Sequence, residues 1–319
     1  MPQDVVVSRD QSAHVFDITG DVAGMRVVMV NVYFIGQRGG PWFLLDAGLP
    51  FSAKRIRDAA AERYGDGSRP EAILLTHGHF DHVGVLKELA EEWDVPVYAH
   101  SLEMPFITGK SKYPPPDPTV GGGLMAFMAP LYPRRPVDVS SRALVLPEDG
   151  SVPGLPEWRW IHTPGHTAGH VSFHRESDKL VVAGDAFITT KQESLFSVIA
   201  QKPEFNGPPA YYTSDWDAAR RSVERLAELS PRIVACGHGL PMRGEDATRG
   251  LWHLAANFDR IARPKQGRYV HMPAITDEQG IVSLPPAVPN RKAQAVGLVA
   301  AGLLAGVWVT AATRRKARD

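Results

Sequence analysis

The chain has 319 residues, of which 44% are hydrophobic and 22% charged, and its 35 Lys and Arg residues balance its 35 Asp and Glu residues. A chain of this length and apolar content can bury a substantial core, as one large domain or two ordinary ones. The zero net charge argues against a nucleic-acid-binding protein, because no overall positive field would draw the chain to a polyanion.

The first residues and the single cysteine bear on the cellular compartment. Residues 1–9 lack a basic stretch followed by an apolar segment of signal-peptide length. Cys236 is the only cysteine, which excludes an intramolecular disulfide. These features predict a cytoplasmic catalytic domain.

Strand and helix patterns alternate through the first hundred residues. The predicted strands span residues 27–35, 42–46, 71–76 and 95–100. The first two lie on either side of a glycine-rich turn and predict a hairpin. Residues 52–64 and 83–93 have apolar residues at helical spacing. This alternation predicts sheets with helices packed outside.

A cluster of metal-binding residue types follows the strand predicted for 71–76. The stretch is Thr76-His77-Gly78-His79-Phe80-Asp81-His82. Neutral imidazole binds zinc and similar divalent ions, and a carboxylate adds negative charge. We expect His77 and His79 to bind one ion, and Asp81 and His82 to reach a second. The alternative is a solvated turn with incidental histidines, which the recurrence of the pattern downstream disfavours.

Residues 101–142 break the regular pattern. They are rich in proline, glycine, methionine and aromatic residues and show little periodicity. An insertion of this length is either a surface loop or a lid over a site. The Met and aromatic content favours a lid-like insertion, while packing as a small satellite core or an oligomer contact stays open.

Further metal-binding residue types recur in the second half. The predicted strands there span residues 158–161, 171–174, 180–183 and 233–236, and the predicted helices span 214–229 and 248–262. His166, Asp185 and His238 each follow one of these strands. Residues 171–174 and 180–183 predict a hairpin, so His166 and Asp185 can end at the same sheet edge.

Four ordered motifs carry a resemblance to a known family. They are Thr-His-Gly-His-Phe-Asp-His, His-Thr-Pro-Gly-His, Ala-Gly-Asp and Cys-Gly-His. Their order over about residues 25–262 resembles the metallo-β-lactamase superfamily of metal-dependent hydrolases. The resemblance implies an α+β fold, the αββα sandwich, in which two mixed sheets pack face to face with helices outside.

The resemblance also implies a ligand set for a dinuclear site. The implied ligands of the first ion are His77, His79 and His166. Those of the second are Asp81, His82 and His238, and Asp185 bridges the two. Two zinc ions per chain are expected, with iron or manganese as alternatives. We expect His170 to hold the loop without touching metal, and Cys236 to pack as a buried thiol.

The implied chemistry is hydrolysis by a metal-bridging hydroxide, with Asp81 orienting it and passing its proton to the leaving group. The expected substrate is a small, partly apolar molecule with an ester, lactone or thioester bond, and no nucleic-acid partner is expected. Lactonase and glyoxalase II relatives are the branches it resembles most. Lactonases that cleave acyl-homoserine lactones have a tyrosine where this chain has Ile188. The alternative is an iron-dependent oxidoreductase or dioxygenase on the same fold.

The C-terminal part suggests a different role. We expect a hydrolase domain over residues 1–280, a proline-containing linker over 281–292, a transmembrane helix over 293–313 and a basic tail over 314–319. Residues 295–312 carry no charge and are flanked by basic residues, as in a membrane anchor. A buried helix or a homodimer contact remains the alternative for this segment.

Overall fold

The computed structural model describes residues 15–121, 123–191 and 203–289. The chain divides after Pro285 into two units, and only residues 286–289 of the second are described. The expected transmembrane helix at 293–313 and the basic tail at 314–319 lie outside the described residues. Within the described ranges, every helix is too short or too polar to cross a membrane.

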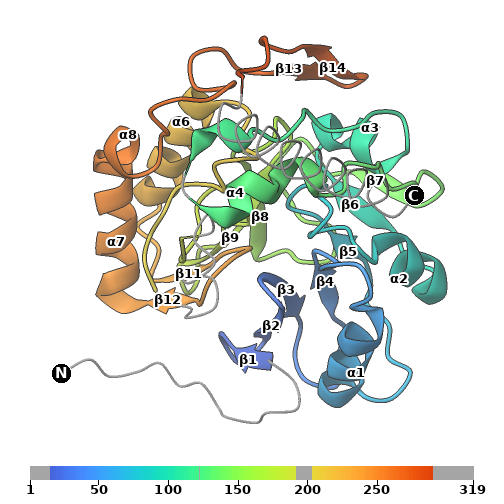
Figure 1. Ribbon diagram of the computed structural model, residues 1–319. Helices are drawn as coiled ribbons and strands as arrows, with labels where there is room; N and C mark the ends of the chain where they lie inside the picture. The colour runs from blue at the N-terminus through green and yellow to red at the C-terminus, as the bar shows by residue number, and fades with distance from the viewer. Residues whose placement is uncertain (1–14, 122, 192–202, 290–319) are drawn as a thin grey trace, which may run out of the picture. The chain divides into compact units, whose positions relative to one another are not determined.

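The first sheet has seven strands in sequence order (Figure 1). They are β1 (Val15–Asp17), β2 (Val22–Val27), β3 (Val30–Ile35), β4 (Phe43–Leu45), β5 (Ile73–Leu74), β6 (Val97–Ala99) and β7 (Ala143–Val145). Strands β1 to β4 pair antiparallel, and β4 to β7 pair parallel. The parallel crossovers contain α1 (Ala53–Tyr64) and α2 (Leu86–Trp93), as parallel strands require.

The second sheet has five strands in the order β12, β11, β10, β9, β8. They are β8 (Trp158–His162), β9 (Val171–Arg175), β10 (Leu180–Val182), β11 (Ile233–Ala235) and β12 (Met242–Arg243). Only β10 and β11 pair parallel, and α6 (Trp216–Glu228) lies in the connection between them. Helices α7 (Gly244–Ala256) and α8 (Phe258–Ile261) follow.

Three apolar clusters show how the layers pack. Leu44 lies in a cluster with residues of α1 and α2, whereas Leu45 lies in a cluster that joins the two sheets. Val182 joins the same inter-sheet cluster, whereas its neighbour Val181 packs with α6 and α7. Alternating residues thus serve opposite faces of each sheet, as the pleat dictates. The αββα sandwich of two mixed sheets expected from the sequence is confirmed.

Two predicted elements were wrong in extent. The strand predicted over residues 27–35 is broken by a turn at Val28 and Met29, which joins β2 to β3. Val28 takes a positive φ of 59°, which periodicity in an apolar run does not reveal. The helix predicted over 248–262 begins earlier, at Gly244, and is interrupted between α7 and α8 at Asn257.

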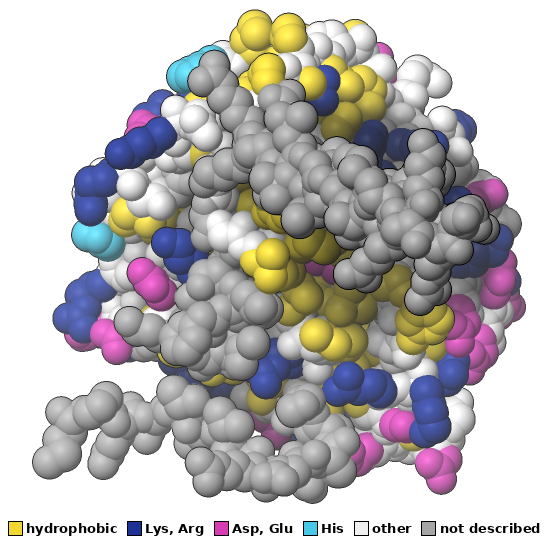
Figure 2. Space-filling model, in the orientation of Figure 1, with side chains coloured by type: hydrophobic (Ala, Val, Ile, Leu, Met, Phe, Trp, Pro, Cys, Tyr) yellow, Lys and Arg dark blue, Asp and Glu magenta, His cyan; other side chains and the backbone are white. Residues whose placement is uncertain are grey.

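The insertion at residues 101–142 contains short helices. They are η1 (Ser101–Glu103), α3 (Met104–Ile107), η2 (Pro118–Val120), α4 (Leu124–Met128) and η3 (Ala129–Leu131). Its apolar side chains divide between buried and exposed: Phe106 is 2% exposed, whereas Leu131 is 73% exposed. In Figure 2 hydrophobic side chains gather in the middle of the face that carries α4.

A small hairpin closes the first unit. Strand β13 (Ile275–Asp277) pairs antiparallel with β14 (Gly280–Ser283). The linker predicted over 281–292 therefore starts too early, because residues 281–283 are paired with β13. Gly280 at the turn has a φ of 114°, a conformation that favours glycine.

Candidate metal centre

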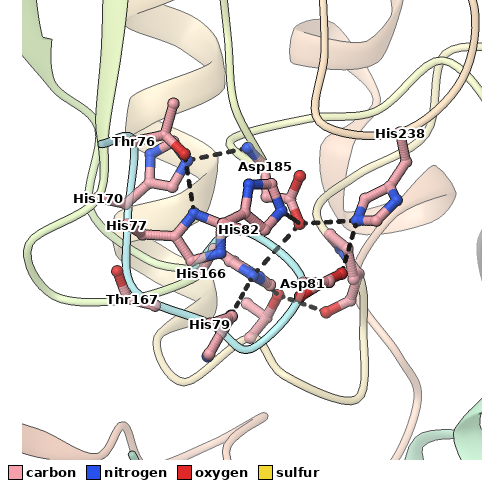
Figure 3. A network of polar contacts seen from close by, with 12 residues as sticks. Thr76, His77, His79, Asp81, His82, His166, Thr167, His170, Asp185 and His238 are labelled. Carbon is pink, nitrogen blue, oxygen red and sulfur yellow. Dashed lines mark hydrogen bonds and ion pairs between the residues drawn. The ribbon is translucent and has the colours of Figure 1, made fainter. Parts of the chain in front are cut away.

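The seven candidate ligands all follow the ends of strands. His77, His79, Asp81 and His82 lie in the loop after β5, and His166, Asp185 and His238 follow β8, β10 and β11 respectively. The first loop comes from one sheet and the other three from the second sheet. The structure brings the seven side chains together where these loops meet (Figure 3).

The seven side chains form three overlapping groups whose ligand atoms lie within 4.8 Å of one another. The groups are His77, His79 and His166; His77, His82 and Asp185; and Asp81, His82 and His238. Within the first group, Nδ1 of His79 lies 2.9 Å from Nε2 of His166. Groups of three donors at this spacing are suited to holding metal ions.

Asp185 lies between the other ligands. Its Oδ2 is 3.2 Å from Nε2 of His238, 3.5 Å from Nε2 of His166 and 3.6 Å from Nε2 of His82. A Cβ atom at Gly237 would lie 2.1 Å from Oδ1 of Asp185, so glycine is required at that position. One carboxylate thus reaches imidazoles of both ligand triads that the sequence implied.

Three buried atoms at the centre lack a hydrogen-bond partner among the described residues. They are Nε2 of His77, Nε2 of His82 and Oδ1 of Asp185. An unpaired buried polar atom costs free energy, so each needs a partner. Imidazole nitrogens and carboxylate oxygens are the donors that zinc and other first-row divalent ions prefer. The residues therefore fit a divalent metal ion.

Other buried groups orient the candidate ligands. Oδ2 of Asp46 lies 2.8 Å from Nδ1 of His82, and the Met29 carbonyl lies 2.7 Å from Nδ1 of His238. His170 accepts a 2.9 Å hydrogen bond from the Asp185 backbone amide and touches Thr163 through its other nitrogen. His170 thus contacts the loop rather than joining any of the three groups.

Burial and neighbouring charges divide the histidines into two sets. Burial and the neighbouring imidazoles hold the pKa of His77 and His79 well below the usual value, and burial lowers the pKa of His166 to about 3. For His82 and His238 burial also disfavours the charged form, but two carboxylates together outweigh it and raise the pKa of each: Asp185 and Asp46 for His82, and Asp185 and Asp81 for His238. The lowered pKa values favour neutral imidazoles at His77, His79 and His166, whereas the raised values favour protonated forms of His82 and His238, whose protons a bound cation would have to displace.

The remaining histidines and the cysteine lie outside these groups. His162 is half-buried at the end of β8, donates to the Ala168 carbonyl and stacks on His100. His174 is buried in β9. Cys236 is fully buried, as expected for a packing thiol. His14 lies outside the described residues.

Sequence reasoning missed several residues around the centre. Asp46 is buried at the end of β4, and Glu103 and Tyr113 are buried in the insertion against the loop after β5. Tyr212 has a buried hydroxyl without a partner among the described residues, and its ring lies 4.5 Å from that of His79. Of these four residues, only Asp46 could have been suspected from the sequence, because it is a carboxylate at the end of a predicted strand, two residues before Gly48.

A small pocket adjoins the candidate ligands. Its lining comes from the metal-binding loops, from the insertion, from Tyr212 and from the C-terminal hairpin. His79 and His166 form part of the wall, together with Phe106 and Tyr113. No Lys, Arg, Asp or Glu side chain is among the described residues that line it. The described wall thus mixes aromatic side chains with hydroxyl and imidazole groups.

Comparisons with known proteins agree with this geometry. The family model described as the metallo-beta-lactamase superfamily matches residues 25–238. The chain is 49% identical to the probable metallo-hydrolase YflN of Bacillus subtilis (strain 168) over 248 residues, which is 77% of this chain and 94% of that protein.

Solved structures share the fold at lower identity. The BLEG-1 B3 metallo-beta-lactamase matches with a TM-score of 0.52 and 21% identity, covering 70% of this chain and 93% of that one. The peroxy diiron species of the chemotaxis sensor ODP matches with a TM-score of 0.50 and 18% identity, and the match covers 76% of this chain and 94% of that one. At these identities the likeness concerns the fold alone.

Proposed function

The chain belongs to the metallo-beta-lactamase superfamily and is a metal-dependent hydrolase, and from that premise we propose that it holds two divalent metal ions and hydrolyses an ester, lactone or thioester. The observation that carries this proposal is the convergence of seven buried ligand side chains in three overlapping groups. Seven candidate ligands exceed the four that a tetrahedral zinc site takes, so two ions account for the set better than one.

We assign the ligands as the sequence implied. His77, His79 and His166 would hold one ion, Asp81, His82 and His238 the other, and Asp185 would bridge them. When bound, such ions lower the pKa of water toward neutrality and polarise the oxygen of the scissile bond. The burial of the set supports this assignment, since a water-excluded site strengthens electrostatic interactions.

Asp81 is suited to moving a proton during the reaction. It is 9% exposed, more than any other residue of the seven, and burial still raises the pKa of its carboxyl group. Its Oδ2 lies 3.5 Å from Nε2 of His238, which keeps the carboxylate in the cluster. A carboxylate with a raised pKa can take a proton from the attacking water and deliver it to the leaving group.

The surroundings of the centre support a small, partly apolar substrate. The rings of Phe80, Tyr132 and Tyr212 lie 5.7 to 6.4 Å apart, and Ala126 and Ala129 of the insertion pack with them. The insertion therefore contacts the motif loop itself, which supports its role as a lid. The aromatic and alanine side chains beside the motif loop favour a substrate with an apolar part.

The test is hydrolysis of a panel that contains a lactone, a thioester, an aryl ester, a phosphodiester and a β-lactam. Protein as purified is compared with chelator-treated protein and with protein reloaded with zinc, manganese or iron. We expect cleavage of a carboxylic ester, lactone or thioester that is lost on chelation and restored by metal. Oxygen consumption by iron-loaded protein without hydrolysis would instead support the oxidoreductase alternative.

A further inference from the structure

Glu103 is a fully buried carboxylate between the two loops that carry the three-histidine group. It ends η1, and its side chain faces Gly78 in one loop and Thr167 and Gly169 in the other. Figure 3 shows Thr167 beside the ligand cluster. None of the four sequence motifs includes Glu103.

Each oxygen of Glu103 serves one loop. Oε2 accepts from the Gly78 amide at 3.0 Å and from the Tyr113 hydroxyl, which itself accepts from the same amide at 2.8 Å. Oε1 accepts from the Thr167 hydroxyl at 2.7 Å and from the Gly169 amide at 3.0 Å. One rigid group therefore joins the loop of His77 and His79 to the loop of His166.

The packing around this carboxylate is close on both sides. A Cβ atom at Gly78 would lie 2.7 Å from the Tyr113 hydroxyl, and one at Gly169 would lie 2.8 Å from atoms of Glu103. Glycine on each loop thus permits an approach that a side chain would block. The spacing of the two loops is set at these contacts.

Burying a carboxylate is costly unless donors surround it. Among the described residues no cationic side chain pairs with Glu103, and its partners are two hydroxyls and two backbone amides. Burial raises the pKa of the Glu103 carboxyl group, whereas the four donors favour its ionised form, to which hydrogen bonds are short and strong. A neutral side chain of similar size could fill the space but could not accept from both loops.

We propose that Glu103 is a positioning residue that fixes His77, His79 and His166 at the separation required to bind one metal ion. This inference rests on the proposed metal centre. The other triad has separate supports, because Asp46 orients His82 and the Met29 carbonyl orients His238. Loss of Glu103 should therefore lower the affinity for the ion held by His77, His79 and His166 much more than the affinity for the other ion.

The experiment uses the full chain titrated with Co²⁺ in place of the native ion. Affinity is measured by chelator competition and ligand geometry by the visible absorption of the bound cobalt. In Glu103→Gln the amide nitrogen cannot accept a hydrogen bond, so one of the two loops loses its hydrogen bonds to residue 103. We expect the affinity of one ion to fall about 10- to 100-fold, with an altered spectrum that resembles that of His166→Ala.

Asp117→Asn is the matched control. Asp117 is a buried carboxylate in the same insertion, 3% exposed, and it accepts from Thr119 and from the Arg268 amide rather than from a metal-binding loop. Its variant should keep the wild-type cobalt affinity and spectrum. If Glu103→Gln does not fold, Tyr113→Phe and Thr167→Val take its place, because each removes one hydrogen-bond donor to Glu103. Each should lower the affinity for the same ion by a smaller factor.

The outcomes separate this inference from the proposed function. Wild-type protein that binds no cobalt and hydrolyses nothing would overturn both. Wild-type protein that binds two ions, with Glu103→Gln matching it in affinity and spectrum, would overturn only the role of Glu103. Equal weakening in the Glu103 and Asp117 variants would also overturn it, because the effect would then be general loosening of the fold.

Discussion

At the scale of single residues, Asp46 shows how the centre depends on groups that would not touch an ion. It is 1% exposed and accepts from the Thr76 amide, the Thr76 hydroxyl and His82, each at 2.8 Å. It therefore fixes both the strand end before the motif and the ring of one candidate ligand.

Asp46→Ala leaves these buried donors without an acceptor. Each unsatisfied donor costs roughly 1–3 kcal/mol, so we expect the free energy of unfolding to fall by about 3 kcal/mol or more. Metal affinity should fall about 10- to 100-fold as His82 loses its orientation. Urea unfolding of metal-free protein and chelator competition measure the two effects. Wild-type metal affinity in this variant would contradict the orienting role of Asp46 for His82.

Metal binding should release protons. The pKa of His82 and His238 is raised in the metal-free protein, so both hold protons to higher pH than a free histidine does. His77, His79 and His166 have lowered pKa values and are already neutral, so they release none. A bound cation must displace protons from the first two, and apparent affinity should therefore fall as pH falls through neutrality.

Calorimetry in two buffers of different ionisation enthalpy at pH 7 measures the protons released per chain. Release should shrink in His82→Ala and in His238→Ala. Equal binding heats in the two buffers, together with affinity that does not change between pH 6 and 8, would contradict this account of the two histidines.

The candidate ligands could be predicted from the sequence, but most of the buried residues that contact them could not. The motif loop and the positions of His166, Asp185 and His238 are readable because each lies in the loop that follows a predicted strand. Glu103 and Tyr212 are not readable, because both come from irregular segments whose position depends on tertiary packing. Periodicity carries no information about such residues.

At the scale of elements, the β2–β3 turn contains a residue with a strained backbone next to one that contacts a candidate ligand. Val28 is 67% exposed and has a φ of 59°, a left-handed conformation that disfavours β-branched side chains. The carbonyl of the next residue, Met29, accepts from His238. The apolar run through this turn explains why the sequence predicted one continuous strand.

Val28→Asn should relieve this strain. Asparagine adopts the left-handed region more readily, so we expect the free energy of unfolding to rise by about 1 kcal/mol. Val282→Asn is the control, since Val282 is also exposed, at 58%, but lies in a strand. Urea unfolding of the three proteins compares them. Destabilisation by Val28→Asn would mean that the valine side chain makes a favourable contact.

The insertion is the element that we propose lies against the substrate. Tyr132 follows η3, its ring lies 5.7 Å from Phe80, and its hydroxyl donates to the Met125 carbonyl. We expect Tyr132→Ala to lower kcat/KM for an apolar ester about tenfold, since about 1.4 kcal/mol of substrate binding would be lost. Metal content should not change.

Leu131→Ala serves as the control for that variant, because Leu131 is the residue before Tyr132, at the end of η3, and is 73% exposed. Its kinetics should match those of the wild type. Equal kcat/KM values for all three proteins across several substrates would show that Tyr132 does not contact the substrate.

At the scale of the whole first unit, two sheets bring separate loops to one place. The inter-sheet cluster, which includes Leu45, Phe173 and Val182, joins the sheet of the first motif to the sheet of the other three. The succession of strands and helices predicted only sheets with helices outside, and the sandwich itself was predicted from the resemblance of the four motifs to the superfamily. The breaks at Val28 and Asn257 were not predictable, because local backbone geometry rather than periodicity decides them.

The most direct measurement is elemental analysis of purified wild-type protein and of Asp185→Ala, paired with hydrolysis of the ester, lactone and thioester substrates. Asp185 lies within 3.6 Å of imidazole nitrogens from His82, His166 and His238, so its loss should affect both proposed ions. We predict close to two divalent ions per chain in the wild type, fewer in the variant, and hydrolysis at least 100-fold slower, the order of loss that about 2.7 kcal/mol of transition-state stabilisation represents. Full metal content and full activity in Asp185→Ala would contradict the dinuclear centre.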